Sequence, residues 1–232
     1  MRVVILQPGY IPWLGFFDQL AKSDTFVIYD DVQYDKNGWR NRNRIKTPQG
    51  SLWLTVPVLT KGKNSPSNRE VMIDNKHMWQ KKHISSIYQS YYKSPYFKDY
   101  FYRLESILLK DYEKLLDLNM DIIYLLADCL GIETKILFSS ELGVEGEKGE
   151  RVLDICKHLN AEEYLTGDSA KNYLDEGKFS ENSIKLIYHN YLHPVYNQMH
   201  GEFIPYLSVM DLLFNHGRES LSILKDSAGI CA

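Results

Sequence analysis

Cysteine is scarce in this chain, and the three residues present, Cys129, Cys156 and Cys231, do not stand at the spacing of a zinc site or a disulfide framework. Long apolar runs are also missing. Only four apolar residues follow Arg2 before the polar Gln7 and Pro8, too few for a signal peptide, and no later run has the length of a membrane span. We therefore expect a cytoplasmic protein with no membrane span and no bound metal.

An excess of one charge is missing as well. The chain has 27 Lys and Arg residues against 30 Asp and Glu residues, a formal net charge of −3. This balance predicts no bulk attraction to nucleic acid, so we expect no DNA partner. Aromatic residues, by contrast, are plentiful, with 17 Tyr and 4 Trp, and 44% of the 232 residues are hydrophobic. Such a chain can form one large α/β domain, and we expect a single domain over residues 1–232.

The order of the expected elements predicts the fold. Residues 3–6 are a continuous apolar, β-branched run, typical of a strand buried on both faces of a parallel sheet. A helix over about 13–21 and a strand over 25–29 follow. Strands are expected again at 134–138, 163–166 and 183–189, with a helix over 147–159. We predict a Rossmann-like parallel sheet interrupted by a β-hairpin at about 37–58 and by a helical insert at about 75–131, with helices at about 75–91, 96–109 and 112–130.

Polar residues follow the first two predicted strands directly. Gln7 and Tyr10 follow the first, and Asp30 and Asp31 follow the second. Ligands of open parallel sheets bind at the carboxyl ends of the strands. We therefore expect Asp30 or Asp31 to act as a catalytic base, with Gln7 and Tyr10 shaping the pocket.

The hairpin region is rich in arginine. If residues 39–46 are extended, Arg40, Arg42, Arg44 and Lys46 share one face, which must meet solvent or an anion. Guanidinium groups suit phosphate oxygens, and we favour phosphate binding by Arg40 and Arg42. Pocket-lining roles are expected for Gln33, Trp39 and Asn41. The polar segment 59–72, with its Gly, Pro and Ser residues, is expected to be a loop able to close over the site.

Two further cations extend this set. His83 shares a helical stripe with Trp79 and Ile87 and follows Lys82. It is either a functional residue, as a catalytic base or as a hydrogen-bond donor to phosphate, or a structural histidine. Lys171 lies in a Gly/Ser loop that opens a short helix after the strand at 163–166, which suits phosphate binding or simple helix capping. The histidines at 189, 193 and 200 are expected to be hydrogen-bonding loop residues, and Ser208 with Asp211 to cap a helix.

Short motifs along most of the chain together resemble the WbqC-like protein family. They are Gln7-Pro8-x-Tyr10-x-Pro12-x-x-Gly15, Asp30-Asp31-Val32-Gln33-Tyr34, Trp39-x-Asn41-Arg42-Asn43-x-Ile45, Lys82-His83, Tyr164-Leu165-Thr166-Gly167 with Tyr173-Leu174, and Ser208-x-x-Asp211-Leu-Leu-Phe-Asn215. The resemblance spans residues 1–217. It implies a place in O-antigen, lipopolysaccharide or other surface-polysaccharide biosynthesis, and a glycine transferase acylating an amino sugar has been suggested within that family.

A second resemblance concerns the fold alone. Residues 9–16 are similar to the first turn of nucleotidylyltransferases and class I aminoacyl-tRNA synthetases, in which His-x-Gly-His holds ATP phosphates. Trp13 and Phe16 stand at the two histidine positions here. Phe has no hydrogen-bond donor and Trp has one rigid N–H. The resemblance therefore implies a HUP-like or nucleotidyltransferase-like fold rather than adenylyl transfer.

These observations lead to one function hypothesis and two alternatives. The leading hypothesis is an N-acyltransferase or aminoacyltransferase that forms an amide on a nucleotide-linked amino sugar, with Asp30, Asp31 or His83 as base. The residue pattern does not identify the acyl donor or cofactor: ATP, CoA, a carrier protein or an aminoacyl donor could supply the group. The alternatives are an ATP-using nucleotidyltransferase-like enzyme or ligase, and a non-catalytic protein that binds a nucleotide sugar or a partner.

Overall fold

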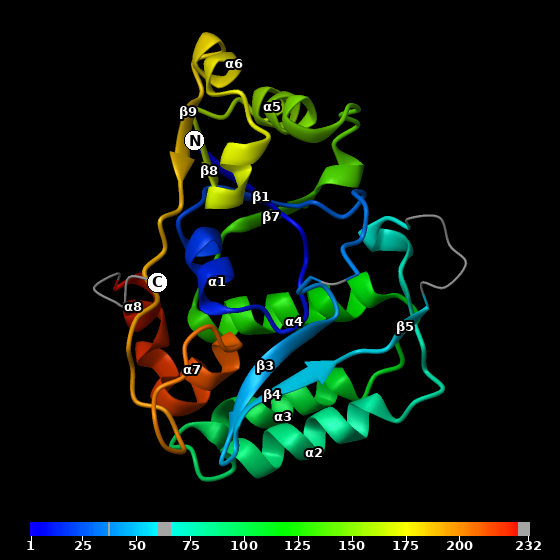
Figure 1. Cartoon of the computed structure of the whole chain (residues 1–232), viewed down its shortest axis with the longest axis vertical. Helices are drawn as coiled ribbons and strands as arrows, with labels where there is room; N and C mark the ends of the chain where they lie inside the picture. The colour runs from blue at the N-terminus through cyan, green and yellow to red at the C-terminus, as the bar shows by residue number, and fades with distance from the viewer. Residues whose placement is uncertain (37, 60–65, 227–232) are drawn as a thin grey trace.

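A five-stranded parallel sheet lies at the centre of the computed structural model, which describes residues 1–36, 38–59 and 66–226. Its strands, in spatial order, are β7 (Lys135–Phe138), β2 (Thr25–Ile28), β1 (Arg2–Leu6), β8 (Glu163–Thr166) and β9 (Lys185–Tyr188) (Figure 1). Taken in chain order, the strands run 3-2-1-4-5 across the sheet, which is the Rossmann-like order. The predicted fold class is confirmed.

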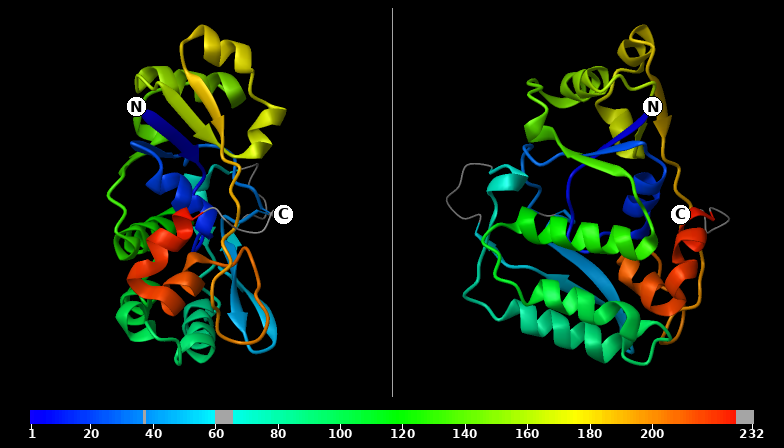
Figure 2. Two further views of the ribbon diagram at one scale, coloured as in Figure 1. Left: turned by 90° about the vertical axis from the view of Figure 1, so that its left-hand side faces the viewer. Right: turned by 180° about the vertical axis from the view of Figure 1, so that it is seen from behind.

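Helices cover both faces of the sheet. On one face, Val4 and Phe26 pack into a cluster with residues of α1 (Leu14–Ala21) and α4 (Leu115–Leu130). On the other face, Val3 and Val27 pack with residues of α5 (Lys148–His158) and α6 (Glu176–Glu181). Figures 1 and 2 show α5 and α6 on one side of the sheet and α1 and α4 on the other. Because the central strands are buried on both faces, they carry continuous apolar runs.

The chain between β2 and β7 holds the predicted hairpin and helices. The hairpin pairs β3 (Arg42–Thr47) with β4 (Gly50–Thr55), and a second small pair joins β5 (Val58–Leu59) to β6 (Met72–Ile73). Helices α2 (Trp79–Tyr91) and α3 (Phe97–Leu108) precede α4 and lie at the end of the molecule opposite α5 and α6 (Figure 1). Of the loop expected at 59–72, residues 60–65 lie outside the described part of the chain.

The remaining elements are short. They are the 3₁₀ turns η1 (Asn68–Glu70), η2 (Ser139–Glu141), η3 (Asp168–Asn172) and η4 (Gly217–Glu219), and the last two helices, α7 (Val209–His216) and α8 (Ser220–Lys225). Of the predicted capping pair, Ser208 does cap α7, since its hydroxyl accepts from the Met210 N–H, but the Asp211 side chain accepts from the Tyr91 hydroxyl instead of completing the cap. Within residues 1–36, 38–59 and 66–226, none of the helices combines the length and the apolar character needed to cross a bilayer.

Two helices begin later than predicted, for reasons outside their own periodicity. The helix expected from Asn75 begins at Trp79 (α2). The Asn75 side chain donates to the Tyr112 carbonyl, a contact with a distant segment that holds Asn75 outside the helix. The helix expected from Tyr112 begins at Leu115, because the backbone there pairs with the β6 region: Ile73 N donates to Glu113 O, and Leu115 N to Val71 O.

The expected row of four exposed cations is wrong at both ends. Arg40 precedes β3, so it lies outside the alternation of that strand. Lys46 is 1% exposed, and its ammonium donates to the Gln198 side-chain carbonyl (3.0 Å) and the Glu202 backbone carbonyl (2.6 Å). A buried ammonium is tolerated where carbonyl oxygens accept its protons. Only the middle of the row, Arg42 and Arg44, remains on the outer face of the hairpin.

Candidate functional site

The strand order changes direction between β1 and β8, and ligands of such sheets bind at the carboxyl edge beside this point. Gln7 leaves β1 at this edge, and Gly167 leaves β8 beside it. The 3₁₀ turn η1 anchors the same edge: the Asn68 amide donates to Gln7 Oε1 and to the Tyr29 carbonyl, both at 3.2 Å. Gln7 and the two aspartates that follow β2 therefore lie at this edge, as predicted, but the side chains that contact them are not those of the hairpin arginines.

Asp30 and Asp31 lie side by side, as expected, but they bond to the scaffold. Asp30 is 2% exposed and accepts from the Ser139 hydroxyl (3.0 Å), the Ser140 N–H (3.1 Å) and the Ser140 hydroxyl (2.7 Å). Asp31 accepts from the Ser139 hydroxyl (2.6 Å) and makes a two-pronged pair with Arg151, at 3.0 and 2.5 Å. The two carboxylates thus tie β2 to η2 and α5.

The electrostatics of Asp31 follow from these contacts. Burial acts to raise its pKa, but the Arg151 and Ser139 hydrogen bonds act in the other direction, and the net pKa is lowered. The cation next to the aspartates is therefore Arg151 of α5, not an arginine of the hairpin. The prediction that the aspartates share a crevice with the hairpin guanidinium groups is therefore wrong: Asp31 pairs with Arg151.

Gln7, Trp39 and Arg40 do come together, around a cavity of about 210 Å³ at the start of α1. We call it the β1 cavity. Arg40 Nη1 donates to the carbonyls of Gln7 (3.0 Å) and Pro8 (3.4 Å). Burial lowers the Arg40 pKa. The full lining is Leu6, Gln7, Gly9, Pro12, Trp13, Phe16, Gln19, Trp39, Arg40 and Asn43.

Gly15 allows the wall of this cavity to form. A Cβ at that position would lie 2.3 Å from the Trp13 ring, so only glycine lets the indole fold back over the first turn of α1. The ring is also held by edge contact with Tyr191, at 5.4 Å between centroids. The Gly15 position in the first sequence motif is therefore a requirement for close approach.

Two indoles and two guanidinium groups form a surface beside the cavity. Trp39 and Trp53 lie 5.2 Å apart, Arg42 lies 4.8 Å over Trp53, and Arg44 lies 5.8 and 5.6 Å over Trp39 and Trp53. We call these four residues the guanidinium–indole surface. Both indoles are more than 40% exposed, so their rings are open to a ligand. Such surfaces bind ligands that combine a ring with negative charge.

His83 and Lys82 line a second cavity, of about 350 Å³, between the hairpin and α2. We call it the α2 cavity. Its lining is Leu52, Trp53, Leu54, Thr55, Pro57, His77, Trp79, Lys82, His83 and Ser86. His83 is 5% exposed and its Nδ1 lies 2.8 Å from the Tyr10 hydroxyl. Burial lowers the pKa of His83 to about 4, although a hydrogen bond with the Thr55 backbone acts in the opposite direction. The ring is therefore neutral at pH 7.

The other predicted site residues lie elsewhere. Asn41 is buried and donates to the Val56 carbonyl at 2.8 Å, whereas Gln33 is exposed and pairs across a single β-bridge with Ser67. Lys171 pairs with Asp168 at 2.6 Å and lies over the Tyr188 ring, in the turn η3 that follows β8. Lys171 thus lies beyond β8, away from the lining of both cavities.

The loop histidines make hydrogen bonds, as predicted. His189 contacts the buried Asp18 at 2.5 Å, His193 contacts the Pro194 carbonyl at 2.9 Å, and His200 contacts the Ser90 carbonyl at 2.8 Å. No three His, Cys, Asp or Glu side chains converge as a ligand set anywhere in the part of the chain that the structure describes.

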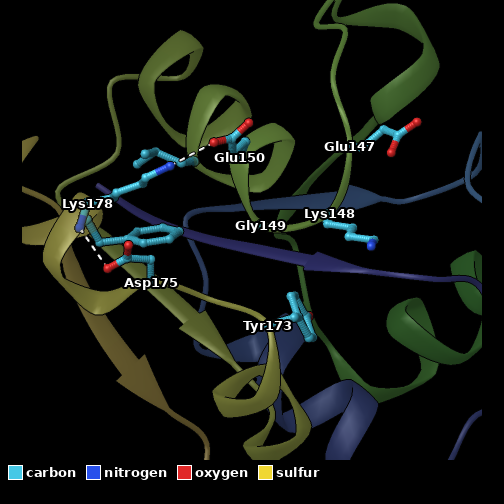
Figure 3. A pocket seen from close by; sticks show the side chains of 9 residues that line it. Glu147, Lys148, Gly149, Glu150, Tyr173, Asp175 and Lys178 are labelled. Atoms are coloured by element: carbon cyan, nitrogen blue, oxygen red, sulfur yellow. Dashed lines mark hydrogen bonds and ion pairs between the residues drawn. The ribbon is translucent and has the colours of Figure 1, made fainter.

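A third cavity lies between the start of α5 and the segment that follows η3. Figure 3 shows this space of about 310 Å³, bordered by the start of α5 and by Tyr173 and Asp175 from the other side. Glu150 pairs with Lys178 at 2.7 Å, and Asp175 caps α6 through Gly177 N. Its carboxylates at 150 and 175 are thus engaged in holding α5 and α6.

Sequence reasoning missed Trp53, Gln19 and Arg151. Trp53 could have been found, because a hairpin turning at residues 47–50 sets it opposite Arg44. Gln19 gives no signal of its own, being one polar residue on an apolar helix. Arg151 lies 120 positions from Asp31, and no local pattern connects the two.

The comparisons with known proteins agree with the motifs. Over 226 residues the chain is 40% identical to "Uncharacterized protein Rv1507c" of Mycobacterium tuberculosis (strain ATCC 25618 / H37Rv), covering 97% of each chain. No solved structure matches the sequence. Residues 7–223 match the WbqC-like protein family. The chain belongs to the WbqC-like protein family.

Proposed function

We propose that this protein is an acyl- or aminoacyltransferase, glycyl transfer included, that forms an amide on a nucleotide-linked amino sugar for O-antigen or another surface polysaccharide. The observation that carries the proposal is a pair of neighbouring cavities. The β1 cavity includes Trp39, the α2 cavity includes Trp53, and the two indoles are in contact at 5.2 Å. A transfer reaction needs two substrates held side by side, and this arrangement provides two adjoining places.

The charges favour the nucleotide sugar at the hairpin. Arg42 and Arg44 on the guanidinium–indole surface suit the diphosphate, and the exposed indoles suit a ring of the same ligand. The β1 cavity, at about 210 Å³, has room for one ring of such a ligand rather than for all of it. The acyl donor then occupies the α2 cavity, where Lys82 is exposed and cationic.

His83 is the base that the geometry favours. In amide formation the amine nitrogen bonds to the acyl carbon, the bond to the leaving group breaks, and the amine loses a proton. The His83 ring lines the α2 cavity and is unprotonated at neutral pH, since burial lowers its pKa to about 4. Asp30 and Asp31 remain the other candidates. Their oxygens accept hydrogen bonds from Ser139, Ser140 and Arg151, and His83 likewise contacts the Tyr10 hydroxyl, so the choice of His83 rests on its place in the lining of the α2 cavity.

A thermal-shift panel tests the binding step. We expect UDP- or dTDP-linked amino sugars to raise Tm, with about 2.7 kcal/mol of stabilisation at 100 times Kd. Arg44→Gln and Trp53→Leu should each weaken this shift, because they remove charge and stacking from the surface. Arg103→Gln is the matched control, since Arg103 forms an exposed ion pair with Asp128 on α3 and α4. ATP and acyl-CoA in the same panel report on the donor; no shift with any nucleotide sugar contradicts the proposal.

A second candidate function is a non-catalytic nucleotide-sugar-binding protein. The observation that favours it is the set of internal hydrogen bonds made by Asp30 and Asp31. Amide formation from a bound amino sugar and a panel of donors (ATP with glycine, acyl-CoA, glycyl-tRNA) separates the two. For an enzyme, His83→Gln should lower turnover by about 10²-fold or more while the Kd for the sugar nucleotide stays within a few-fold. Tight binding with no product from any donor would favour the binding protein.

A further inference from the structure

The charged residues are unevenly distributed along the chain. Residues 36–110 contain 15 Lys and Arg residues against 4 Asp and Glu residues, whereas residues 111–181 contain 7 against 17. The near balance of the whole chain is therefore the sum of two regions of opposite sign. The basic region supplies the hairpin, α2 and α3, which lie at the end of the molecule opposite α5 and α6 of the acidic region (Figure 1). Such an asymmetry indicates a polyanionic partner or an anionic surface at the basic end.

The exposed face of α2 combines cations with aromatic rings. Helical spacing sets Lys81, Tyr88 and Tyr92 on one stripe, and Lys93 lies over the Tyr92 ring at 5.4 Å. The two tyrosines are 47% and 48% exposed, and α2 contains no Asp or Glu. Within the described part of the chain, the ammonium groups of Lys81, Lys82 and Lys93 have no ion-pair partner. These cations are therefore available to a ligand.

The α2 cavity lies beside this face. Lys82 belongs to both, since it lines the cavity and follows Lys81 on the helix. On the hairpin side, the cavity is lined by Trp53 of the guanidinium–indole surface, and Arg42 lies over that indole. A ligand that extends from the cavity along either wall therefore meets cations next to exposed rings.

We propose that the acyl donor is an aminoacyl-tRNA, whose unpaired 3′ end binds along the exposed face of α2 and brings its aminoacyl group into the α2 cavity. This inference rests on the proposed function, which places the donor in that cavity. Lysine ammonium groups suit the phosphates, and tyrosine rings suit the flat faces of unpaired bases. Charge alone would also suit an acidic carrier protein or an anionic membrane. The exposed rings between the lysines favour RNA.

The group transfer balances without a further reagent. The nitrogen of the sugar amine bonds to the carbonyl carbon of the aminoacyl ester, and the bond from that carbon to the terminal ribose oxygen breaks. The proton lost by the amine passes by way of His83 to the ribose oxygen, which leaves as a hydroxyl. Because the ester is already activated, this step consumes no ATP.

Fluorescence anisotropy with a labelled acceptor-stem RNA that ends in a single-stranded 3′ end measures the binding step. We expect Lys81→Gln combined with Lys82→Gln to raise Kd at least about 10-fold and to reduce the slope of log K against log salt by about 1.5, since two phosphate contacts are lost. Lys185→Gln is the matched control. Lys185 is an exposed lysine of β9 without an ion-pair partner among the described residues, and its replacement should change neither quantity.

Tyr92→Leu tests stacking separately from charge. We expect Kd for the RNA to rise about 5-fold to 100-fold with the salt slope unchanged, because an unpaired base loses its aromatic partner. Tyr124→Leu is the control, since Tyr124 is 46% exposed but lies on α4 and is absent from the lining of the α2 cavity. An unchanged Kd for Tyr92→Leu, or an equal affinity of the wild-type protein for heparin, would show that only charge is recognised and would overturn the inference.

Turnover separates this inference from the proposed function. With glycyl-tRNA as donor and a UDP- or dTDP-linked amino sugar as acceptor, the double lysine variant should raise KM for glycyl-tRNA about 10-fold or more, while Kd for the sugar nucleotide stays unchanged. Amide formation from acyl-CoA or a carrier-protein thioester, with no binding of RNA, would overturn the inference and leave the proposed function standing. Failure of the wild-type protein to bind any sugar nucleotide would overturn the proposed function, and with it the role of the RNA as donor.

Discussion

Relative to wild type, the free energy of unfolding of Asp211→Asn should rise by about 2 kcal/mol between pH 4 and pH 6. Asp211 is fully buried on α7, and Tyr91 donates to its Oδ1 at 2.8 Å. Burial raises the pKa of Asp211 to about 6, even though the hydrogen bond from Tyr91 lowers it. The folded protein therefore holds this proton more tightly than the unfolded chain, whose carboxyl has the ordinary value of 3.8.

The sign follows from that difference. The stability contributed by protonated Asp211 is fully present below pH 3.8 and is lost as the pH rises through about 6. Asparagine cannot titrate, so the variant does not lose this contribution. Urea titrations followed by tryptophan fluorescence at several pH values measure the difference. A difference between variant and wild type that stays constant with pH would contradict the prediction.

His83→Gln provides the opposite slope as a control. Burial lowers the pKa of His83 to about 4 from an ordinary 6.5, so its contribution to stability is present above pH 6.5 and is lost as the pH falls toward 4. Relative to wild type, His83→Gln should lose about 3 kcal/mol as the pH rises from 4 to 6.5. In the wild-type protein the pH dependences of stability due to Asp211 and to His83 have opposite signs and nearly cancel. Asp211→Asn therefore reveals the pH dependence due to His83, and His83→Gln reveals the one due to Asp211.

Replacing Asp30 with alanine should lower the free energy of unfolding by about 3 kcal/mol at pH 7. The carboxylate accepts from Ser139 and Ser140, and its removal leaves the Ser140 N–H and the Ser140 hydroxyl without their acceptor, whereas the Ser139 hydroxyl still donates to Asp31. Those contacts connect the end of β2 to η2, so the carboxyl edge of the sheet should loosen. Chemical denaturation measures the change.

Asp154→Ala is the control for this prediction. Asp154 is about half exposed and pairs with Lys157 on the surface of α5, so its removal should change stability by less than about 0.5 kcal/mol. If Asp30→Ala is as stable as wild type but loses turnover, the carboxylate serves chemistry rather than the scaffold. Loss of stability with turnover retained in the folded fraction would assign it to the scaffold.

Much of the fold could be predicted because its signals are local. Residues 3–6 lie within β1, since a strand buried on both faces of a parallel sheet carries an unbroken apolar run. The strand at 163–166 also has the predicted bounds. The hairpin turned where Pro48 and Gly50 indicated. Helix starts were less accurate: the pairing of Leu115 with Val71 is a contact between distant segments, which a helical period does not record.

The candidate site was predicted in part. Gln7, Trp39 and Arg40 meet at the β1 cavity, and Lys82 and His83 share the α2 cavity, because each group stands close to a predicted strand end or helix face. The partners of the buried charges could not be predicted. Asp31 pairs with Arg151, and Lys46 donates to Gln198 and Glu202, all more than a hundred positions away in the chain.

By itself, the sequence determined the layered α/β architecture, the place of the hairpin and helices between two strands, and the family. Those features depend on apolar periodicity and on short motifs, which neighbouring residues carry. Only the tertiary structure decided which polar groups were satisfied and which were left open. Asp30 and Asp31 found donors on η2 and α5, whereas Gln19 Oε1 is buried without a partner among the described residues. Hydrogen bonding of a buried group depends on what folding brings within about 3 Å of it, and chain order does not encode that distance.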